Sequence, residues 1–221
     1  MLFRSCVLAY AAVGALIEWR RLPSIVVTLG LSFVWLGLAV TLLPTPGGKA
    51  PAWLAQLMQW KPPGAPLAIW VAAALCLVGW LIVSRSAVGV VVRGAGGNAR
   101  ALRRAGWSLI GIRVGVYAAA GVLGVLSGLS LLGLTTSGDA NIASRYTLIS
   151  IAAVILGGAS FVGGRVFPAG AVIGAVTLTL ASSFLTFMRI SPDWQVGAQG
   201  LILVAVLALR AVLARGRETA P

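Results

Sequence analysis

The chain has 221 residues, of which 59% are hydrophobic, and its mean hydropathy is +1.00. This composition excludes a water-soluble domain, and repeated apolar stretches near the ~20 residues that cross a bilayer indicate an all-α polytopic membrane protein. A net charge of +13 would suggest a nucleic-acid partner in a soluble protein, but the basic residues cluster in short loops between apolar runs, so membrane topology explains them better. The chain has no histidine, and Cys6 and Cys76 both lie in apolar runs, which disfavours a histidine-based metal site and a disulfide.

About seven hydrophobic segments are predicted to cross the membrane, all within one domain of residues 1–221. Arg4 precedes the first segment, but Glu18 and two arginines follow it where a signal peptide would have a small-residue cleavage site, so we interpret this segment as a span. The predicted spans cover about 5–18, 24–43, 67–84, 108–132, 147–163, 169–187 and 197–213.

Basic residues are concentrated in alternate loops, and this pattern predicts the orientation of the chain. The loops richer in arginine are expected to face the cytoplasm, which places the N-terminus outside and the C-terminus inside. The arginine-rich side holds Arg20, Arg21, Arg85, Arg93, Arg100, Arg103, Arg104, Arg165, Arg215 and Arg217; the other side holds Arg4, Lys49, Lys61, Arg145, Arg189, Asp139 and Asp193.

The long outer connection 44–66 is predicted to contain a short amphipathic helix. Within it, Trp53, Leu54, Leu57 and Trp60 are expected on one helical face. Such a helix would lie in the membrane interface with its tryptophans at headgroup depth. A docking surface for an extracytoplasmic partner is the alternative interpretation.

The loop 85–107 on the arginine-rich side is predicted to contain a short cationic helix at about 98–106. Gly96 and Gly97 are expected to break the chain, Asn98 to cap the helix at its start, and Gly106 to end it. From the residues alone, this helix is either an anchor on anionic headgroups or a coupling helix that fits a groove on a nucleotide-binding subunit.

Residues 146–164 combine an apolar run with two glycine pairs, Gly157–Gly158 and Gly163–Gly164. Backbone freed from a helix is tolerated in lipid only where protein or a water-filled cavity covers it, so this stretch indicates either a broken helix on a transport pathway or a small-residue packing face. Further small-residue packing motifs are predicted at Gly111 and Gly115, at Gly124 and Gly128, and at Gly170 and Gly174.

Four motifs in the same order resemble those of ribose-type sugar permeases, in the branched-chain amino acid and ribose permease superfamily of bacterial ATP-binding-cassette (ABC) importers. They are 22–30 (LPSIVVTLG), Gly96–Gly97–Asn98 with Ala101 and Gly106, the stretch Ile151–Gly164 preceded by a turn containing Tyr146, and 191–195 with Gly200 and Leu201. The likeness runs from about residue 12 to about 212.

The resemblance implies a permease subunit that moves a monosaccharide such as ribose by alternating access. Its partners would be an ABC ATPase subunit, a periplasmic or lipid-anchored substrate-binding protein, a second permease copy and membrane lipid, with no nucleic acid. The chain would be no enzyme and would hold no cofactor, because ATP and Mg²⁺ would bind to the ATPase. Its location would be the bacterial inner membrane.

Residue roles follow from the resemblance and from the chemistry of a neutral sugar, which needs hydrogen-bonding and stacking groups. ATPase coupling is expected of Gly97, Asn98, Arg100, Ala101, Arg103, Arg104 and Gly106. The pathway or helix packing is expected to involve Trp35, Leu156, Gly157, Gly158, Ser160, Gly163, Gly164, Ser182 and Ser183, with Thr177 and Thr179 as further candidates. Serines and threonines in spans commonly bond back to helix carbonyls instead. Asp139 and Asp193 are expected to dock a binding protein or to be solvated loop charges.

The sequence also departs from the family pattern. Leu102 and Val166 replace a usual alanine and glycine, and 182–184 (Ser-Ser-Phe) replaces a common Asn-Asn-Gly. Family members usually carry further spans ahead of the segment at 22–30, so we expect a shortened permease or a fragment. The alternatives are the same architecture with a branched-chain amino acid, nucleoside or signalling furanone as cargo, a non-transporting remnant, or a channel.

Overall fold

The computed structural model describes residues 2–60, 62, 67–159, 163–189 and a few isolated positions between 191 and 204. Within the described part the chain is helical, and its only β-structure is an isolated bridge between Gly47 and Gly138. The helices are α1 (Leu2–Arg20), α2 (Ser24–Leu42), α3 (Ala52–Gln59), α4 (Leu67–Arg85), α5 (Ala87–Gly97), α6 (Ala99–Arg104), α7 (Leu109–Thr135), α8 (Ile142–Leu156) and α9 (Pro168–Phe187).

Four of these helices, α2, α4, α7 and α9, are long and apolar enough to cross a membrane. They confirm the spans predicted at 24–43, 67–84, 108–132 and 169–187, but the structure does not confirm a count of seven. Helix α1 carries charges at both ends, and α8 has only 15 residues, or about 22 Å, against the ~30 Å thickness of a hydrocarbon core. Most of the seventh predicted span, 197–213, lies outside the described residues.

The prediction of a span at 147–163 is wrong at both ends. Helix α8 begins at Ile142, so Tyr146 lies inside the helix rather than in a turn before it. The helix ends at Leu156, because Gly157 caps it and Gly158 has a φ of +99° that suits a turn and no helix. The glycine pair therefore breaks the chain earlier than the apolar run alone indicates.

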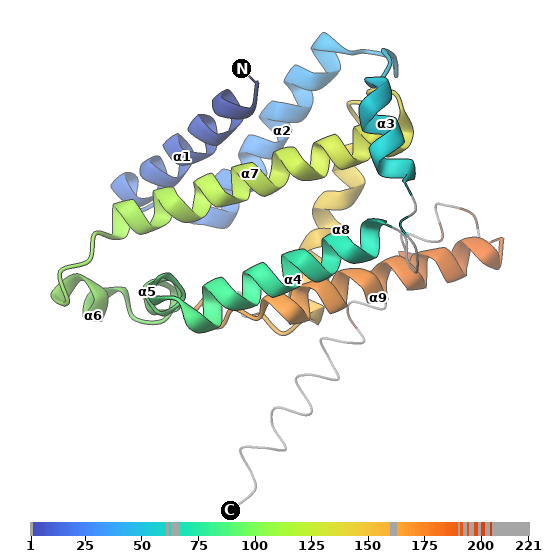
Figure 1. Ribbon diagram of the computed structural model, residues 1–221. Helices are drawn as coiled ribbons and strands as arrows, with labels where there is room; N and C mark the ends of the chain where they lie inside the picture. Colours follow the sequence, from blue (N-terminus) through green and yellow to red (C-terminus); the bar gives the residue numbers. More distant parts are fainter. Residues whose placement is uncertain are drawn as a thin grey trace, which may run out of the picture.

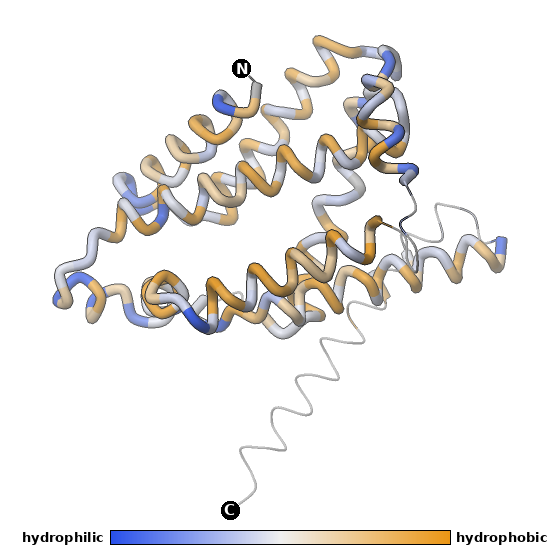
Figure 2. Tube along the Cα trace, viewed as in Figure 1, coloured by the Kyte–Doolittle hydropathy of each residue, from blue (hydrophilic) through white to orange (hydrophobic). Residues whose placement is uncertain are grey.

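Most of the helices form two groups that converge at the end of the molecule that carries α5 and α6, and α8 crosses between the groups (Figure 1). Helix α1 runs along α7, and α3 lies across the far end of α7, while α4 lies beside α9, which also packs on α8. Helix α5 contacts α4, α6 and α7, so it joins the two groups. Hydrophilic residues gather at the ends of the long helices and apolar residues lie between them (Figure 2), as expected for a bundle that spans a membrane.

Backbone pairing fixes which loops share the end opposite α6. Gly47 and Gly138 donate their N–H groups to each other's carbonyls at 3.0 and 2.9 Å, and the Ala50 N–H donates to the Thr136 carbonyl at 2.9 Å. The loop after α2 and the loop after α7 therefore lie together. We call this end the bridge end, and the end that carries α5 and α6 the arginine end.

Helix α3 confirms the short helix predicted in the connection 44–66, but not its single apolar face. Leu54 is buried against Gly133 of α7, and the half-buried Met58 contacts the same glycine one turn later. Trp53, 62% exposed, points away from this contact, because residues three and four apart share a helix face and residues 53 and 54 do not. The helix thus packs on α7 with one face and presents tryptophan with another.

Glycine determines how closely α8 and α9 approach. A Cβ at Gly157 or Gly174 would meet the backbone carbonyl of Gly170 or Ala153, respectively, so the prediction of a packing motif at Gly170 and Gly174 is confirmed. The α7 motifs behave differently: Gly115, Gly124 and Gly128 have nothing within 4 Å, and Gly111 meets only Ser108 of its own cap. No described helix packs on these glycines, so the packing motifs of α7 stay a prediction.

Gly157→Ala is expected to lower the melting temperature of the detergent-purified protein. Its Cβ would push against the Gly170 carbonyl, and overpacking costs about 1–3 kcal/mol. Gly128→Ala is the matched control, since it has open space around it and alanine favours a helix over glycine by about 1 kcal/mol. Equal melting temperatures for the two variants would contradict the close contact of α8 with α9.

Candidate functional site

Helix α6 is the cationic helix that the sequence predicts, and its local geometry explains where it begins and ends. The Asn98 side chain accepts a hydrogen bond from the Ala101 N–H at 3.1 Å, which caps the helix at its start. Gly106 follows with a φ of +83°, a conformation that favours glycine, and turns the chain toward α7. The six-residue helix is held out at the arginine end of the molecule (Figure 1).

Helix α5 precedes α6 and was not anticipated, because residues 87–97 were expected to be loop. Ser86 caps it by accepting from the Gly89 N–H at 3.3 Å. Gly89 lies directly on the backbone of Ile82 and Val83, where a side chain would not fit, and Val91 is buried. The helix includes Gly96 and ends at Gly97, so the chain breaks after the glycine pair and not at Gly96.

Leu102 of α6 is the residue that replaces the family's usual alanine. It packs against Gly94 of α5 rather than pointing toward solvent.

A cluster of three charged residues ties α6 to the long helices. Glu18, near the end of α1, accepts from Arg103 Nη2 at 2.9 Å and from Arg113 Nε of α7 at 2.8 Å. Its side chain is only 9% exposed, whereas Arg103 and Arg113 are about half exposed. We call Glu18, Arg103 and Arg113 the ion triad; it joins α1, α6 and α7.

Glu18 was not anticipated as a functional residue, and Arg103 was expected on a surface that contacts a partner. The structure pairs Arg103 with Glu18 while its side chain stays 52% exposed, so its role in ATPase coupling stays a prediction. A signal was available: Glu18 is one of only four acids in the chain, and it lies at the end of a span among arginines. Such an acid is expected to pair with a basic residue rather than remain alone near the membrane.

Arg100 and Arg104 remain directed outward on α6. Together with Asn98 and Ala101 they line an open depression of about 500 Å³ at the arginine end. In the described part of the chain neither arginine forms an ion pair, since both salt bridges there belong to Glu18. The depression is therefore a cationic surface suited to carboxylates of a partner or to anionic lipid headgroups.

The two most specific motifs of the sequence touch each other through bare backbone. Gly163 and Gly164 have φ values of +92° and +79°, and they pack on Gly96 at the end of α5. A Cβ at Gly163 would lie 2.9 Å from the Gly96 carbonyl oxygen, and a Cβ at Gly96 would meet the Gly164 nitrogen. We call this contact the glycine junction; it connects the segment between α8 and α9 to the element that leads into α6.

Of the residues predicted for the pathway or for packing, Trp35 lines a cavity and most of the others make contacts within or between helices. Leu156 packs on the buried cluster between α8 and α9, and Gly157 and Gly158 form the turn after α8. Ser182 donates to the Leu178 carbonyl at 2.9 Å, as Thr177 and Thr179 do to carbonyls four residues back, while Ser183 is exposed. Ser160 lies outside the described residues.

Asp139 and Asp193 are the two aspartates expected to dock a binding protein. Asp139 lies at the bridge end and accepts from the Asn141 N–H at 2.9 Å, which shapes the turn before α8. Asp193 lies outside the described residues. Within the described ranges no group of three His, Cys, Asp or Glu residues is close enough to hold a metal ion.

Curated relatives share most of this chain. It is 35% identical over 66% of its length to the ribose import permease protein RbsC of Haemophilus influenzae, covering 45% of that protein, and 28% identical over 94% to RbsC of Escherichia coli K12, covering 65%. It is 32% identical over 88% to the autoinducer 2 import system permease protein LsrC of Shigella flexneri, covering 57%. The chain thus spans about half to two thirds of the length of these relatives.

A family model gives the broader assignment. No solved structure matches the chain. The model for the permease component of branched-chain amino acid transport systems matches residues 5–207, which include the ion triad, α6 and the glycine junction. The chain therefore belongs to the family of branched-chain amino acid transport system permease components.

Proposed function

We propose that this chain is the permease subunit of an ABC importer for a small sugar of the ribose type. The observation that carries the proposal is the placement of α6: Arg103 ties it to α1 and α7, while Arg100 and Arg104 face outward. A helix held in this way can receive a push from a partner and pass it to the bundle. The names of the ribose import relatives support the cargo.

The partners follow from the two ends of the molecule. An ABC ATPase binds at the arginine end and holds ATP and Mg²⁺, and a substrate-binding protein docks at the bridge end, where Asp139 lies. The arginine end faces the cytoplasm of a bacterium, so the N-terminus is outside and the C-terminus inside. A second copy of the chain completes the assembly in the inner membrane.

Movement of α6 would reach the bundle along two routes. The ion triad passes it to α1 and α7. The glycine junction passes it through α5 to the segment between α8 and α9. Because each route ends in a different helix group, displacement of α6 would change the angle between the groups, as alternating access by rocking requires.

A second cargo is supported by one specific finding, the 32% identity to the autoinducer 2 import permease. Uptake of radiolabelled D-ribose and autoinducer 2 by cells that express the complete importer separates the two. Transport of L-leucine in place of both would contradict the sugar proposal and favour an amino-acid cargo.

Co-purification with the cognate ATPase tests the proposed partner surface. The double variant Arg100→Glu with Arg104→Glu is expected to lose most of the ATPase that the wild type retains, because both cations face outward on α6. Lys49→Glu with Arg189→Glu makes the same charge change at two exposed residues of the bridge end and is expected to retain it. Failure of the wild type to retain the ATPase would contradict the proposed function.

Glu18→Gln is expected to uncouple ATP hydrolysis from transport. The variant loses both charged hydrogen bonds of the ion triad, but its arginines are half exposed and can rehydrate, so the stability loss is only about 1–2 kcal/mol. In proteoliposomes the sugar carried per ATP hydrolysed should fall several-fold. Glu18→Asp keeps the charge and is expected to restore part of the coupling. An unchanged ratio in Glu18→Gln would remove the ion triad from the mechanism.

Gly96→Ala is expected to open the glycine junction, whereas Gly97→Ala is tolerated. The new Cβ would meet the backbone of Gly164 at residue 96, but at residue 97 it would lie 3.8 Å from Gly164 Cα, an ordinary contact. In Gly96→Ala the free energy of unfolding should fall by about 1–3 kcal/mol, and the melting temperature and the transport rate should fall with it. In Gly97→Ala all three should change little. Similar behaviour of the two variants would contradict the junction.

A further inference from the structure

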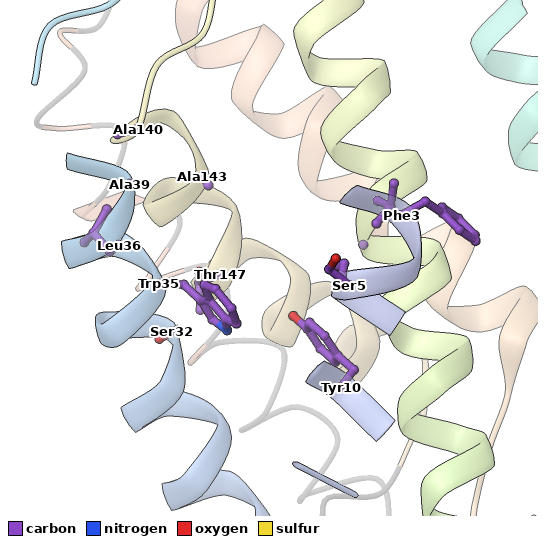
Figure 3. Close-up of a pocket in the computed structure, with 13 residues that line it drawn as sticks. Phe3, Ser5, Tyr10, Ser32, Trp35, Leu36, Ala39, Ala140, Ala143 and Thr147 are labelled. Carbon is purple, nitrogen blue, oxygen red and sulfur yellow. The ribbon is translucent and has the colours of Figure 1, made fainter. Parts of the chain in front are cut away.

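A cavity of about 640 Å³ lies between four helices in the half of the molecule toward the bridge end. Its walls come from the first half of α1, the later half of α2, the middle of α7 and the start of α8 (Figure 3). This volume is within the range of ~300–1,000 Å³ typical of small-molecule sites. In the proposed orientation the cavity lies on the side from which a binding protein would deliver a substrate.

Two aromatic side chains from different helices face this cavity. Tyr10 projects from α1 with its hydroxyl toward the side where Trp35 of α2 and Thr147 of α8 lie (Figure 3). Tyr10 is seated on Gly121 of α7, where a Cβ would lie 3.2 Å from Tyr10 Cβ. Tyr10, Trp35 and Ser32 also line a smaller adjoining cavity of about 60 Å³.

Hydroxyl groups provide the polar part of the lining. Tyr10 and Thr147 can each donate and accept a hydrogen bond. Ser32 donates its proton to the Leu29 carbonyl at 2.6 Å, which leaves its oxygen as an acceptor. Small side chains such as Ala39 and Ala143 form much of the remaining wall and leave room for a ligand.

No charged side chain is found among the described residues that line the cavity. A zwitterionic amino acid would have to place a carboxylate and an ammonium group there without a charged partner, which is costly away from water. A polyhydroxylated neutral ligand would instead pair with the hydroxyls and lay its apolar C–H face on an aromatic ring.

We propose that this cavity is a binding subsite for a neutral monosaccharide, with Trp35 and Tyr10 as stacking surfaces and Tyr10, Thr147 and Ser32 as hydrogen-bonding groups. The proposal rests on the importer function proposed above and adds a subsite within a single chain. No residue of α2 is buried, so α2, which carries Trp35, is the helix around the cavity that packing restrains least. Movement of α2 can therefore admit the ligand.

The two native cysteines provide a direct test. Cys6 lines the cavity and Cys76 lies on α4 away from it, and both are free and partly exposed. The full chain in lipid nanodiscs is treated with N-ethylmaleimide, and the alkylation rate of each cysteine is measured by mass spectrometry. D-ribose is expected to slow alkylation of Cys6 in a saturable manner without changing Cys76, and L-leucine is expected to change neither.

Variants of the lining residues, each with a matched control, test whether D-ribose protects Cys6 by binding in this cavity. Trp35→Leu should raise the half-protecting concentration of D-ribose at least about tenfold, whereas Trp70→Leu, at a similarly exposed tryptophan of α4, should not. Tyr10→Phe and Thr147→Val each remove one hydroxyl and should weaken protection, while Tyr146→Phe, outside the cavity lining, should leave it unchanged.

Three results would overturn the subsite. Protection of Cys6 by L-leucine as strong as that by D-ribose would refute a site for neutral ligands. Protection that survives Trp35→Leu would place the ligand elsewhere, and no protection by either compound would mean that lipid or another segment fills the cavity. Co-purification with the ATPase is a separate measurement. If the ATPase is retained but D-ribose does not protect Cys6, the subsite is rejected and the importer function is not. If D-ribose protects Cys6 but the ATPase is not retained, the importer function is rejected and the subsite is not.

Discussion

The contact between Gly96 and the Gly163–Gly164 turn is the constraint on which the arrangement of the two helix groups depends. It brings backbone against backbone, so it allows no side chain and little change in distance. The ion triad at the same end is different in kind, because charged groups can slide or rehydrate while they remain attracted. The glycine junction is thus a steric link, and the ion triad an electrostatic link, between the α5–α6 region and the rest of the bundle.

Packing within the groups relies on small residues and shape rather than on a large apolar core. Among the described residues, Ile17 of α1 is the only fully buried large side chain, and α2 has no buried residue. In a bilayer lipid tails are as apolar as leucine, so such faces need no protein cover, and close approach at glycine stabilises helix pairs instead. The α8–α9 pair, with Gly157 and Gly174 against backbone carbonyls, follows this rule.

Local features could be predicted from the sequence, because they depend on neighbouring residues. The Asn98 cap, the turn at Gly106 and the four long apolar helices were all anticipated. Contacts between distant segments could not be deduced in this way. Gly124 and Gly128 have the same spacing as Gly170 and Gly174, yet only the second pair meets another described helix. For the same reason the ion pair of Arg103 with Glu18, 85 residues away, was not anticipated.

The separation of 85 residues between Glu18 and Arg103 has a consequence for how the protein is made. Helix α1 leaves the ribosome long before either arginine of the ion triad has been synthesised. An unpaired acid is costly in the hydrocarbon region, so Glu18 is expected to stay near the headgroups until α6 and the start of α7 emerge. The acid of the ion triad is therefore synthesised before both of its arginine partners, so the triad can close only after the start of α7 has been made.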